Sequence, residues 1–213
     1  MLIYQTDHSP FVARLRMAVH AKGIEVEWAD PPDGPGSAAF AKISPLARVP
    51  VMVDRGLTLP ESEVILDYIE DRHPEPPLTP ADPADAARSR LLARLADTYL
   101  AEPLREHFEA IKAETKPPNA VYEQVDRALG WIDHYLGDGG YAVGNRLTRA
   151  DCALVPLLFF VNRCRPLQPH DRLAAYWRRI VQDPVARRVV DEMTQAQARR
   201  AEERARTGAN RIR

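Results

Sequence analysis

The fold is decided by residues 44–72, which read SPLARVPVMVDRGLTLPESEVILDYIEDR. The apolar run 49–53 predicts a β-strand, the Asp-Arg-Gly sequence at 54–56 predicts a turn, and 57–59 predicts a second short strand. Ser62 is a preferred N-cap residue, and the sequence after it predicts a helix to the end of the stretch. The stretch therefore predicts two strands joined by a turn and followed by a helix.

The sequence before this stretch adds two strands and two helices. Residues 2–5 predict a short apolar strand, and the Ser-Pro pair at 9–10 predicts a helix start, because serine caps helices and proline suits their first turn. Gly23 predicts the end of that helix. A strand at 24–29 and a weak helix at 37–43 complete the order βαβαββα. This order predicts an α/β domain with a mixed four-stranded sheet covered by helices.

A proline-rich segment, HPEPPLTPADP at 73–83, separates this domain from a helical one. Its prolines remove backbone donors, so neither a helix nor a central strand continues through it. We expect a first domain at 1–74, a linker at 75–84 and an all-α helical bundle at 85–213. Helices are predicted at 85–112, with a bend near Pro103, and at 119–136, 148–164, 171–180 and 184–206.

Composition excludes several classes of protein. With 213 residues, 45% hydrophobic and 28% charged, the chain is not wholly disordered, collagen-like or a coiled coil. A formal net charge of −1 argues against nucleic acid or an anionic membrane as a partner. We expect no signal peptide, because no basic start followed by an apolar run is found at the N-terminus, and the longest apolar run, 152–161, is far shorter than the ~20 residues that span a bilayer. Cys152 and Cys164 lack a metal-ligand pattern, so we expect a reduced, cytoplasmic protein with no metal.

Four motifs occur in an order typical of one protein family. They are SPF at 9–11 with Arg14 and Arg16 after it, SPLARVP at 44–50, LPES at 59–62 and GNRLTRAD at 144–151. Together they resemble the cytosolic glutathione transferase (glutathione S-transferase) family, in its bacterial-type, serine-activated form, over essentially the whole chain. The resemblance implies a thioredoxin-like N-terminal domain, an all-α helical-bundle C-terminal domain that forms the electrophile pocket, and a two-fold homodimer.

The resemblance implies that the Val49–Pro50 peptide bond is cis, a form that is nearly confined to proline. The N–H and C=O of Val49 would then face outward, where an extended tripeptide pairs with them as an added strand. The alternative is an edge-strand proline in the trans form. Phe11 belongs to the same implied glutathione-binding set.

The resemblance also assigns charged and polar contacts to glutathione. Ser62, at a helix N-terminus, would hold the α-carboxylate of the γ-glutamyl group, and Glu61 would attract its ammonium group. The alternative is that Ser62 only caps the helix and that Glu61 is solvated. Arg48 would lie near the glycyl carboxylate, or else would be an ordinary surface arginine.

The catalytic group must stabilise the glutathione thiolate, because a free thiol titrates near pH 8.5. Ser9 lies between the first strand and the first helix, where a hydroxyl and a helix N-terminus both favour the anion, although it could be a pure N-cap. Tyr4, Thr6 and His8 are the alternative donors. No cysteine lies in the N-terminal domain, which argues against a mixed-disulfide mechanism.

In the helical domain, Tyr99, Arg105 and His107 are candidates for the substrate pocket, because the first long helix walls that pocket in the family. Each residue, taken alone, has a structural or solvated alternative. Thr148 and Asp151 match a capping box, which predicts a folding role and not a catalytic one.

We expect a glutathione transferase whose thiolate attacks a small, partly apolar electrophile, with glutathione as co-substrate. Two alternatives stay open. One is a non-catalytic module that binds a ligand or a protein, because the family usually has Asn-Pro-x-Gly where this chain has SPLA at 44–47, and because the tail 195–213 is rich in arginine. The other is a glutathione-dependent isomerase or dehalogenase, because the same thiolate begins those reactions.

Overall fold

The computed structural model describes residues 1–209, and its chain divides into two compact units. The first unit contains Met1–Tyr68 together with the C-terminal helix α9 (Pro184–Ala209), and the second is Ile69–Asp183. This division differs from the expected domain at 85–213, because α9 packs with the first unit. The last residues of the arginine-rich tail, 210–213, lie outside the described part of the chain.

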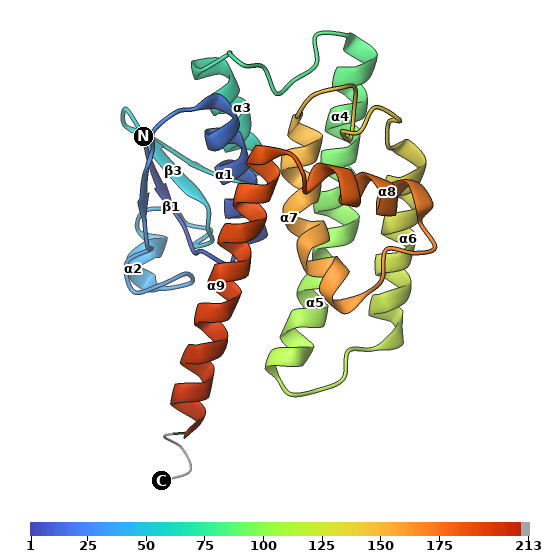
Figure 1. The fold of residues 1–213 in the computed structure, drawn as a ribbon. Helices are drawn as coiled ribbons and strands as arrows, with labels where there is room; N and C mark the ends of the chain where they lie inside the picture. The colour runs from blue at the N-terminus through green and yellow to red at the C-terminus, as the bar shows by residue number, and fades with distance from the viewer. Residues whose placement is uncertain (210–213) are drawn as a thin grey trace. The chain divides into compact units, whose positions relative to one another are not determined.

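The first unit is built on a four-stranded sheet in the order β2-β1-β3-β4 (Figure 1). Its strands are β1 (Leu2–Tyr4), β2 (Glu27–Ala29), β3 (Val51–Asp54) and β4 (Leu57–Pro60). β1 runs parallel to β2 and antiparallel to β3, and β3 pairs with β4 in an antiparallel hairpin. Helix α1 (Pro10–Lys22) makes the crossover that a parallel pair requires. The observed order confirms the expected mixed, thioredoxin-like βαβαββα topology.

Three strands are shorter than the sequence predicts, and the first of them, predicted at 2–5, ends at Tyr4. The run 24–29 joins the sheet only at its last three residues, Glu27–Ala29. The run 49–53 begins to pair only at Val51, because Pro50 has no N–H to donate to a ladder. β3 also lies between β1 and β4 and is not an edge strand, so the alternative of an edge-strand proline is wrong.

Serines cap the first two helices of the first unit. Ser9 caps α1, and Gly23, with a left-handed φ of 63°, ends it. Ser37 caps α2, which is limited to Ala38–Ala41 and is shorter than the predicted 37–43. Helix α3 (Ser62–Arg72) begins at the predicted serine and continues into the second unit. The core between sheet and helices is fully buried and includes Ile3, Leu15, Met52, Ile65 and Leu66.

Helix α9 lies alongside α1 (Figure 1). Its apolar face buries Ala186, Val189, Met193 and Ala196. These residues recur every three or four positions, which is the spacing of one helix face. The apolar stripe explains why a helix that follows the helical domain in sequence packs with the sheet domain in space.

The second unit is helical, as predicted. Its helices are α4 (Pro83–Leu95), the π-helical turn η1 (Ala96–Leu100), α5 (Ala101–Lys112), α6 (Asn119–Tyr135), α7 (Arg149–Cys164) and α8 (Asp171–Ile180). The predicted bend near Pro103 is the wide turn η1, which ends three residues before it. A proline ring clashes with the carbonyl four residues earlier, and a wider turn relieves that clash.

Candidate functional site

The turn before α1 holds Ser9 in position by two hydrogen bonds. The Ser9 N–H donates to the Thr6 carbonyl at 3.2 Å, and the Val12 N–H donates to the Ser9 hydroxyl at 3.3 Å. The capping role expected as an alternative for Ser9 is therefore present. A serine hydroxyl has one proton to donate in addition to its two acceptor sites. Capping the helix therefore leaves the Ser9 hydroxyl proton available to a ligand.

The three alternative donors have different surroundings. The Tyr4 ring packs edge-on against Phe40, with ring centroids 5.5 Å apart. Thr6 and His8 line an open cavity. Burial, followed by the positive charge of Arg200, lowers the pKa of His8, although Asp7 acts in the opposite direction. His8 is therefore a neutral imidazole at neutral pH.

The Val49–Pro50 peptide bond is cis, as the resemblance implies. Val49 lies outside the sheet ladder, and its N–H and C=O form no hydrogen bond with any of residues 1–209. Arg48 is exposed and forms no ion pair within the same part of the chain. The segment before β3 therefore offers a free backbone donor and acceptor next to a free cation.

The turn before α3 carries Glu61 and Ser62. Glu61 is exposed and has a left-handed φ of 69°, a conformation that non-glycine residues adopt mainly where the surrounding structure imposes it. The Ile65 N–H donates to the Glu61 carbonyl at 2.9 Å, which closes the first helical turn. Ser62 is buried at the first position of the helix. Helix N-termini favour anionic ligands, so this turn is suited to a carboxylate.

Arg14 brings a buried cation to the same turn. Its side chain is 1% exposed, and one Nη1 atom donates to the Ser62 hydroxyl at 3.1 Å and to a Glu63 carboxylate oxygen at 3.1 Å. The guanidinium also lies 5.8 Å from the centre of the half-buried Phe11 ring. Arg14 lies in the first of the four motifs, but the motif predicts no role for it. One signal in the sequence indicates a buried cation: Arg14 stands between the apolar residues Ala13 and Leu15 of α1.

An open cavity of about 750 Å³ adjoins the turn that ends at Ser9. We call it the α9 cavity, because α9 forms one wall. The other walls are the turn Gln5–His8, the side chain of Arg16 and the segment around Asp30–Pro35. The cavity lies entirely within the first unit. Sequence reasoning missed it, since α9 is far from the other walls along the chain.

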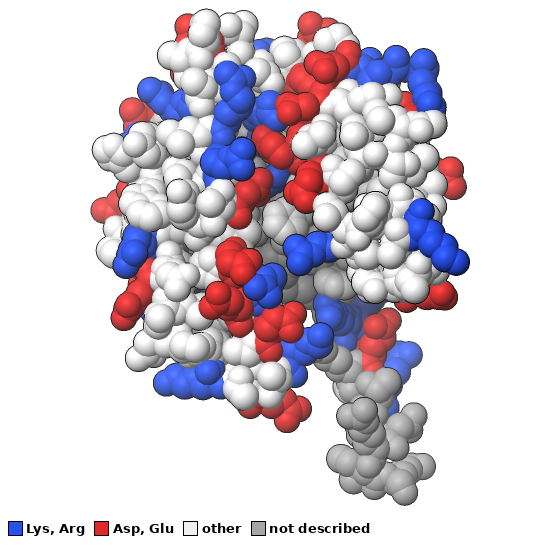
Figure 2. Space-filling view, turned by 180° about the vertical axis from the view of Figure 1, so that it is seen from behind, with Lys and Arg blue, Asp and Glu red and all other residues white. Residues whose placement is uncertain are grey.

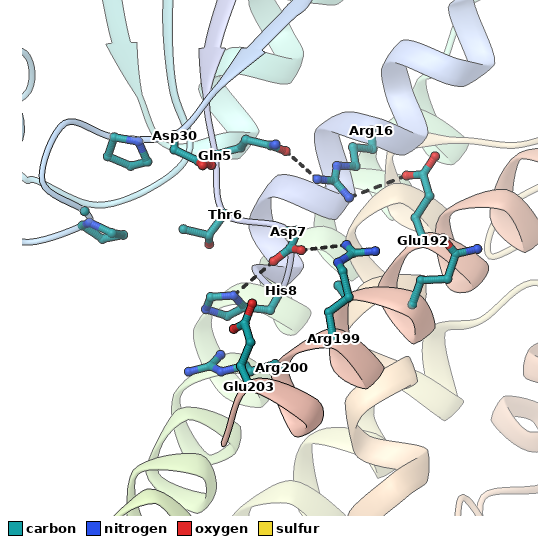
Figure 3. A pocket seen from close by; sticks show the side chains of 15 residues that line it. Gln5, Thr6, Asp7, His8, Arg16, Asp30, Glu192, Arg199, Arg200 and Glu203 are labelled. Atoms are coloured by element: carbon teal, nitrogen blue, oxygen red, sulfur yellow. Dashed lines mark hydrogen bonds and ion pairs between the residues drawn. The ribbon is translucent and has the colours of Figure 1, made fainter. Parts of the chain in front are cut away.

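Ion pairs join the walls of the α9 cavity (Figure 3). Arg199 donates to Asp7 at 2.8 Å, and Arg16 donates to Gln5 at 2.5 Å and lies 3.7 Å from Glu192. Burial alone would raise the pKa of Asp7, but the Arg199 bond and charge, with His8, lower it below its usual value. The Asp7 carboxylate is therefore ionised at neutral pH and holds α9 against the turn.

The three candidates for a substrate pocket lie in the second unit and do not share one environment. Tyr99 is exposed and packs edge-on against Trp131, with ring centroids 5.1 Å apart. Arg105 is exposed and paired with Glu102. His107 is buried, and burial lowers its pKa. Their common function in a pocket stays a prediction.

The capping box at the start of α7 is confirmed, and it is part of a larger buried network. Asp151 is fully buried and accepts hydrogen bonds from the Thr148 N–H, the Ala142 N–H and the Tyr176 hydroxyl at 2.8–2.9 Å. Burial raises the pKa of Asp151 to about 6, against the effect of these bonds. The network joins α7 to α8 and to the loop before α7, so its role is structural.

Four further properties bear on ligand class. Cys152 and Cys164 are free thiols. Among residues 1–209 no group of three or more His, Cys, Asp or Glu side chains is placed to hold a metal. Across that same stretch, no helix has the length and apolar character needed to span a membrane. On the face shown in Figure 2, acidic and basic side chains are interspersed.

Two family models match the chain. The glutathione S-transferase N-terminal domain matches residues 3–77, and the glutathione S-transferase C-terminal domain matches residues 95–184. Both matches agree with the motifs in the sequence, and the first contains Ser9, Val49 and Ser62.

Known proteins resemble the chain over most of its length. A probable glutathione S-transferase of Oryza sativa subsp. indica is 33% identical over 186 residues, which is 80% of each chain. A stringent starvation protein A homolog of Coxiella burnetii is 30% identical over 161 residues, 75% of each chain. The solved structure of a bacterial maleyl pyruvate isomerase, described as a zeta-class glutathione S-transferase, has a TM-score of 0.73 at 26% identity and covers 89% of this chain and 96% of its own.

Proposed function

The chain belongs to the glutathione S-transferase family, and on that premise we propose that it is a glutathione transferase. Its reaction would join the sulfur of glutathione to an electrophilic carbon of a small second substrate. In a substitution, the sulfur lone pair forms the new S–C bond, the leaving group departs with its bonding electrons, and the thiol proton passes to solvent. Glutathione serves as co-substrate, and no metal or redox group takes part in this scheme.

In this proposal glutathione binds along the segment before β3. The free N–H and C=O of Val49 pair with the extended backbone of the tripeptide, as a strand does when it is added to a sheet. Arg48 holds the glycyl carboxylate by its unpaired charge. Pro50 fixes the segment in the cis form, and Phe11, in the first turn of α1, is assigned to the same glutathione-binding set.

The γ-glutamyl end is assigned to the turn before α3. Its α-carboxylate accepts hydrogen bonds from Ser62 and the helix N-terminus, and the exposed Glu61 attracts its ammonium group. The buried Arg14 guanidinium, bonded to the Ser62 hydroxyl, adds a positive charge that favours the carboxylate. Because Arg14 occupies a lone pair of the Ser62 oxygen, the hydroxyl proton is directed toward the ligand.

Ser9 is assigned to the sulfur. The observation that carries this assignment is the Val12 N–H bond to the Ser9 oxygen, which leaves the hydroxyl proton as the group's remaining donor. A hydrogen bond to the thiolate favours the anion over the thiol and so lowers the pKa of the bound thiol. A larger thiolate fraction at neutral pH makes glutathione a more effective nucleophile.

A pair of serine variants tests the role of Ser9. We expect Ser9→Ala to lower conjugation of an activated chloronitrobenzene at least tenfold, and to raise the pKa of bound glutathione toward the free value of about 8.5. Ser37→Ala is the matched control, because Ser37 caps α2 through a 3.0 Å bond from the Phe40 N–H and has no assigned ligand. If Ser9→Ala keeps full activity and an unchanged thiol pKa, the assignment is wrong.

The same assays distinguish the alternatives. Retention on immobilised glutathione without conjugation of any electrophile would support a non-catalytic module, and failure of retention would overturn the proposal altogether. The isomerase name of the structural neighbour favours a second test, in which a cis-enone diacid is incubated with glutathione and enzyme. Isomerisation with glutathione recovered unchanged would replace conjugation as the reaction.

We propose further that the chain acts as a cytoplasmic homodimer, as the family resemblance implies. Light scattering coupled to gel filtration measures the assembly directly. A mass near twice 24.0 kDa is expected, and a monomer at micromolar concentration would contradict this part of the proposal.

A further inference from the structure

The α9 cavity has an unusual lining for an apolar electrophile. Ligand pockets are lined mostly by apolar side chains, with a few polar groups. Here the apolar contribution is limited to Pro31, Pro35 and Ala196. Four carboxylates and three guanidiniums surround them. The volume of about 750 Å³ is within the range of small-ligand sites, so size permits a second substrate and the charges decide its class.

Most of these charges are already paired. Arg199 binds Asp7, and Arg16 is engaged with Gln5 and Glu192. In the ion pairs Arg199–Asp7 and Arg16–Glu192 the opposite charges compensate each other. The first pair links α9 to the turn before α1, and the second links α9 to α1 itself. They are therefore structural, and a ligand that displaced them would have to break them.

Arg200 is different. Its side chain lines the cavity, is exposed, and forms no ion pair with any of residues 1–209. It lies close enough to His8 for its charge to act on that ring. His8 directly precedes Ser9, so the unpaired guanidinium is close to the start of α1. In Figure 3, Arg200 and Glu203 lie beside His8, and Asp30 lies at the other end beside Gln5.

We propose that the second substrate of this protein carries a carboxylate or similar anionic group that Arg200 binds. This inference rests on the proposed transferase function and names the class of its acceptor. A guanidinium binds a carboxylate by charge-assisted hydrogen bonds. The anionic end of the substrate lies toward Arg200, the cavity guanidinium that has no ion pair among residues 1–209, and it binds there beside the Glu203 carboxylate and away from Asp30. The acceptor is therefore an electrophile that carries an anionic group.

The reaction on such an acceptor needs no further co-reactant. With an unsaturated ketone, the glutathione sulfur bonds to the β-carbon, the carbon–carbon π electrons move to the carbonyl oxygen as an enolate, and the α-carbon then takes a proton from water. The carboxylate group itself does not react. It serves to position the acceptor.

Two benzalacetones that differ in one substituent test the proposal. One carries a para-carboxylate and the other a para-carboxamide, which is similar in shape but neutral. We expect the wild-type protein to favour the carboxylate in kcat/KM, and Arg200→Gln to lower the ratio of carboxylate to carboxamide about tenfold, since a hydrogen bond to a charged group contributes about 1.5–3 kcal/mol. Arg200→Lys should restore part of the ratio, and Asp30→Asn should raise it.

Arg206→Gln is the matched control, because Arg206 is an exposed arginine on the same helix that does not line the cavity. If Arg200→Gln conjugates both acceptors with the wild-type ratio of carboxylate to carboxamide in kcat/KM, the proposal of an anionic acceptor is wrong, whereas the proposed transferase function stands. If neither acceptor nor the chloronitrobenzene reacts, the transferase function itself fails and this inference fails with it. The two failures are thus distinguishable.

Discussion

The Arg14 guanidinium donates a 3.1 Å hydrogen bond to the Ser62 hydroxyl and so joins α1 to the start of α3 across 48 residues of sequence. Both side chains are buried, and the same guanidinium is paired with Glu63. A charge this deeply buried is stable only where partners compensate its lost hydration. The turn assigned to the glutathione carboxylate is therefore supported from behind by a residue of another helix.

Replacing Arg14 by methionine should weaken both fold and binding. Methionine keeps much of the apolar volume but removes the donors to Ser62 and Glu63, so we expect a loss of about 1–3 kcal/mol in the free energy of unfolding in urea. The glutathione dissociation constant should rise at least tenfold in calorimetric titration. Arg55→Met is the control, because Arg55 is an exposed arginine in the turn between β3 and β4. Equal glutathione affinity in wild type and Arg14→Met would show that Arg14 acts on stability alone.

The features that sequence predicts well are those with local chemical signals. Ser9 and Thr148 cap the helices expected of them, and Gly23 ends one, because capping depends on groups within a few residues. The mixed four-stranded sheet follows from the alternation of elements along the chain. The cis bond before Pro50 follows from the family resemblance and is present.

The features that sequence does not predict depend on packing between distant segments. The partnership of Arg14 with Ser62 and the wall that α9 adds to the cavity join residues far apart in the chain. The length of β2 depends on how much of β1 is available to pair with it. None of these three relations leaves a periodic or local pattern in the sequence. The proposed anionic character of the acceptor depends on the position of α9, because Arg200 on that helix lines the cavity.

Removing the Asp151 carboxylate should destabilise the helical unit severely. Asp151→Ala leaves buried donors of Ala142, Thr148 and Tyr176 without their acceptor, and we expect a loss of about 3–5 kcal/mol in the free energy of unfolding. Asp171→Ala, an exposed acid in the first turn of α8, should change stability by less than about 0.5 kcal/mol. A similar small effect at both positions would contradict the structural role of the network.

The raised pKa of Asp151 gives stability a specific pH dependence. Its folded pKa of about 6 exceeds the ordinary 3.8, so between these values the folded protein holds a proton that the unfolded chain has lost. This contribution is complete below pH 3.8 and is lost as pH rises through 6. A shift of about two pKa units corresponds to about 3 kcal/mol.

Urea unfolding of wild type and Asp151→Asn at several pH values isolates this contribution, because the other carboxylates are common to both proteins. Between pH 4 and pH 7 the wild type should lose about 2.5 kcal/mol of stability relative to the variant. A stability difference that is flat with pH would mean that Asp151 is ionised throughout the range.

Ala47 offers a substitution that should stabilise the protein. It has a left-handed φ of 47° in the SPLA turn, where the family usually has glycine, and its N–H and C=O are bonded to Ser44 and Gly36 at 2.8 Å. A side chain in this conformation costs roughly 1–2 kcal/mol, which glycine avoids. Since glycine also loses more backbone entropy on folding, we expect Ala47→Gly to gain a net stabilisation of about 0.5–1 kcal/mol and a higher thermal midpoint.

The same chemical change at Ala198 should have the opposite sign. Ala198 is exposed in the middle of α9, where glycine is less favourable than alanine by about 1 kcal/mol. Thermal unfolding of the two variants therefore compares one substitution in two backbone conformations, with no change in charge. If Ala47→Gly lowers the thermal midpoint as Ala198→Gly does, the entropy that glycine adds to the unfolded chain outweighs the relief of the left-handed conformation. Alanine is then the more stabilising residue at position 47, in the turn that leads to Val49.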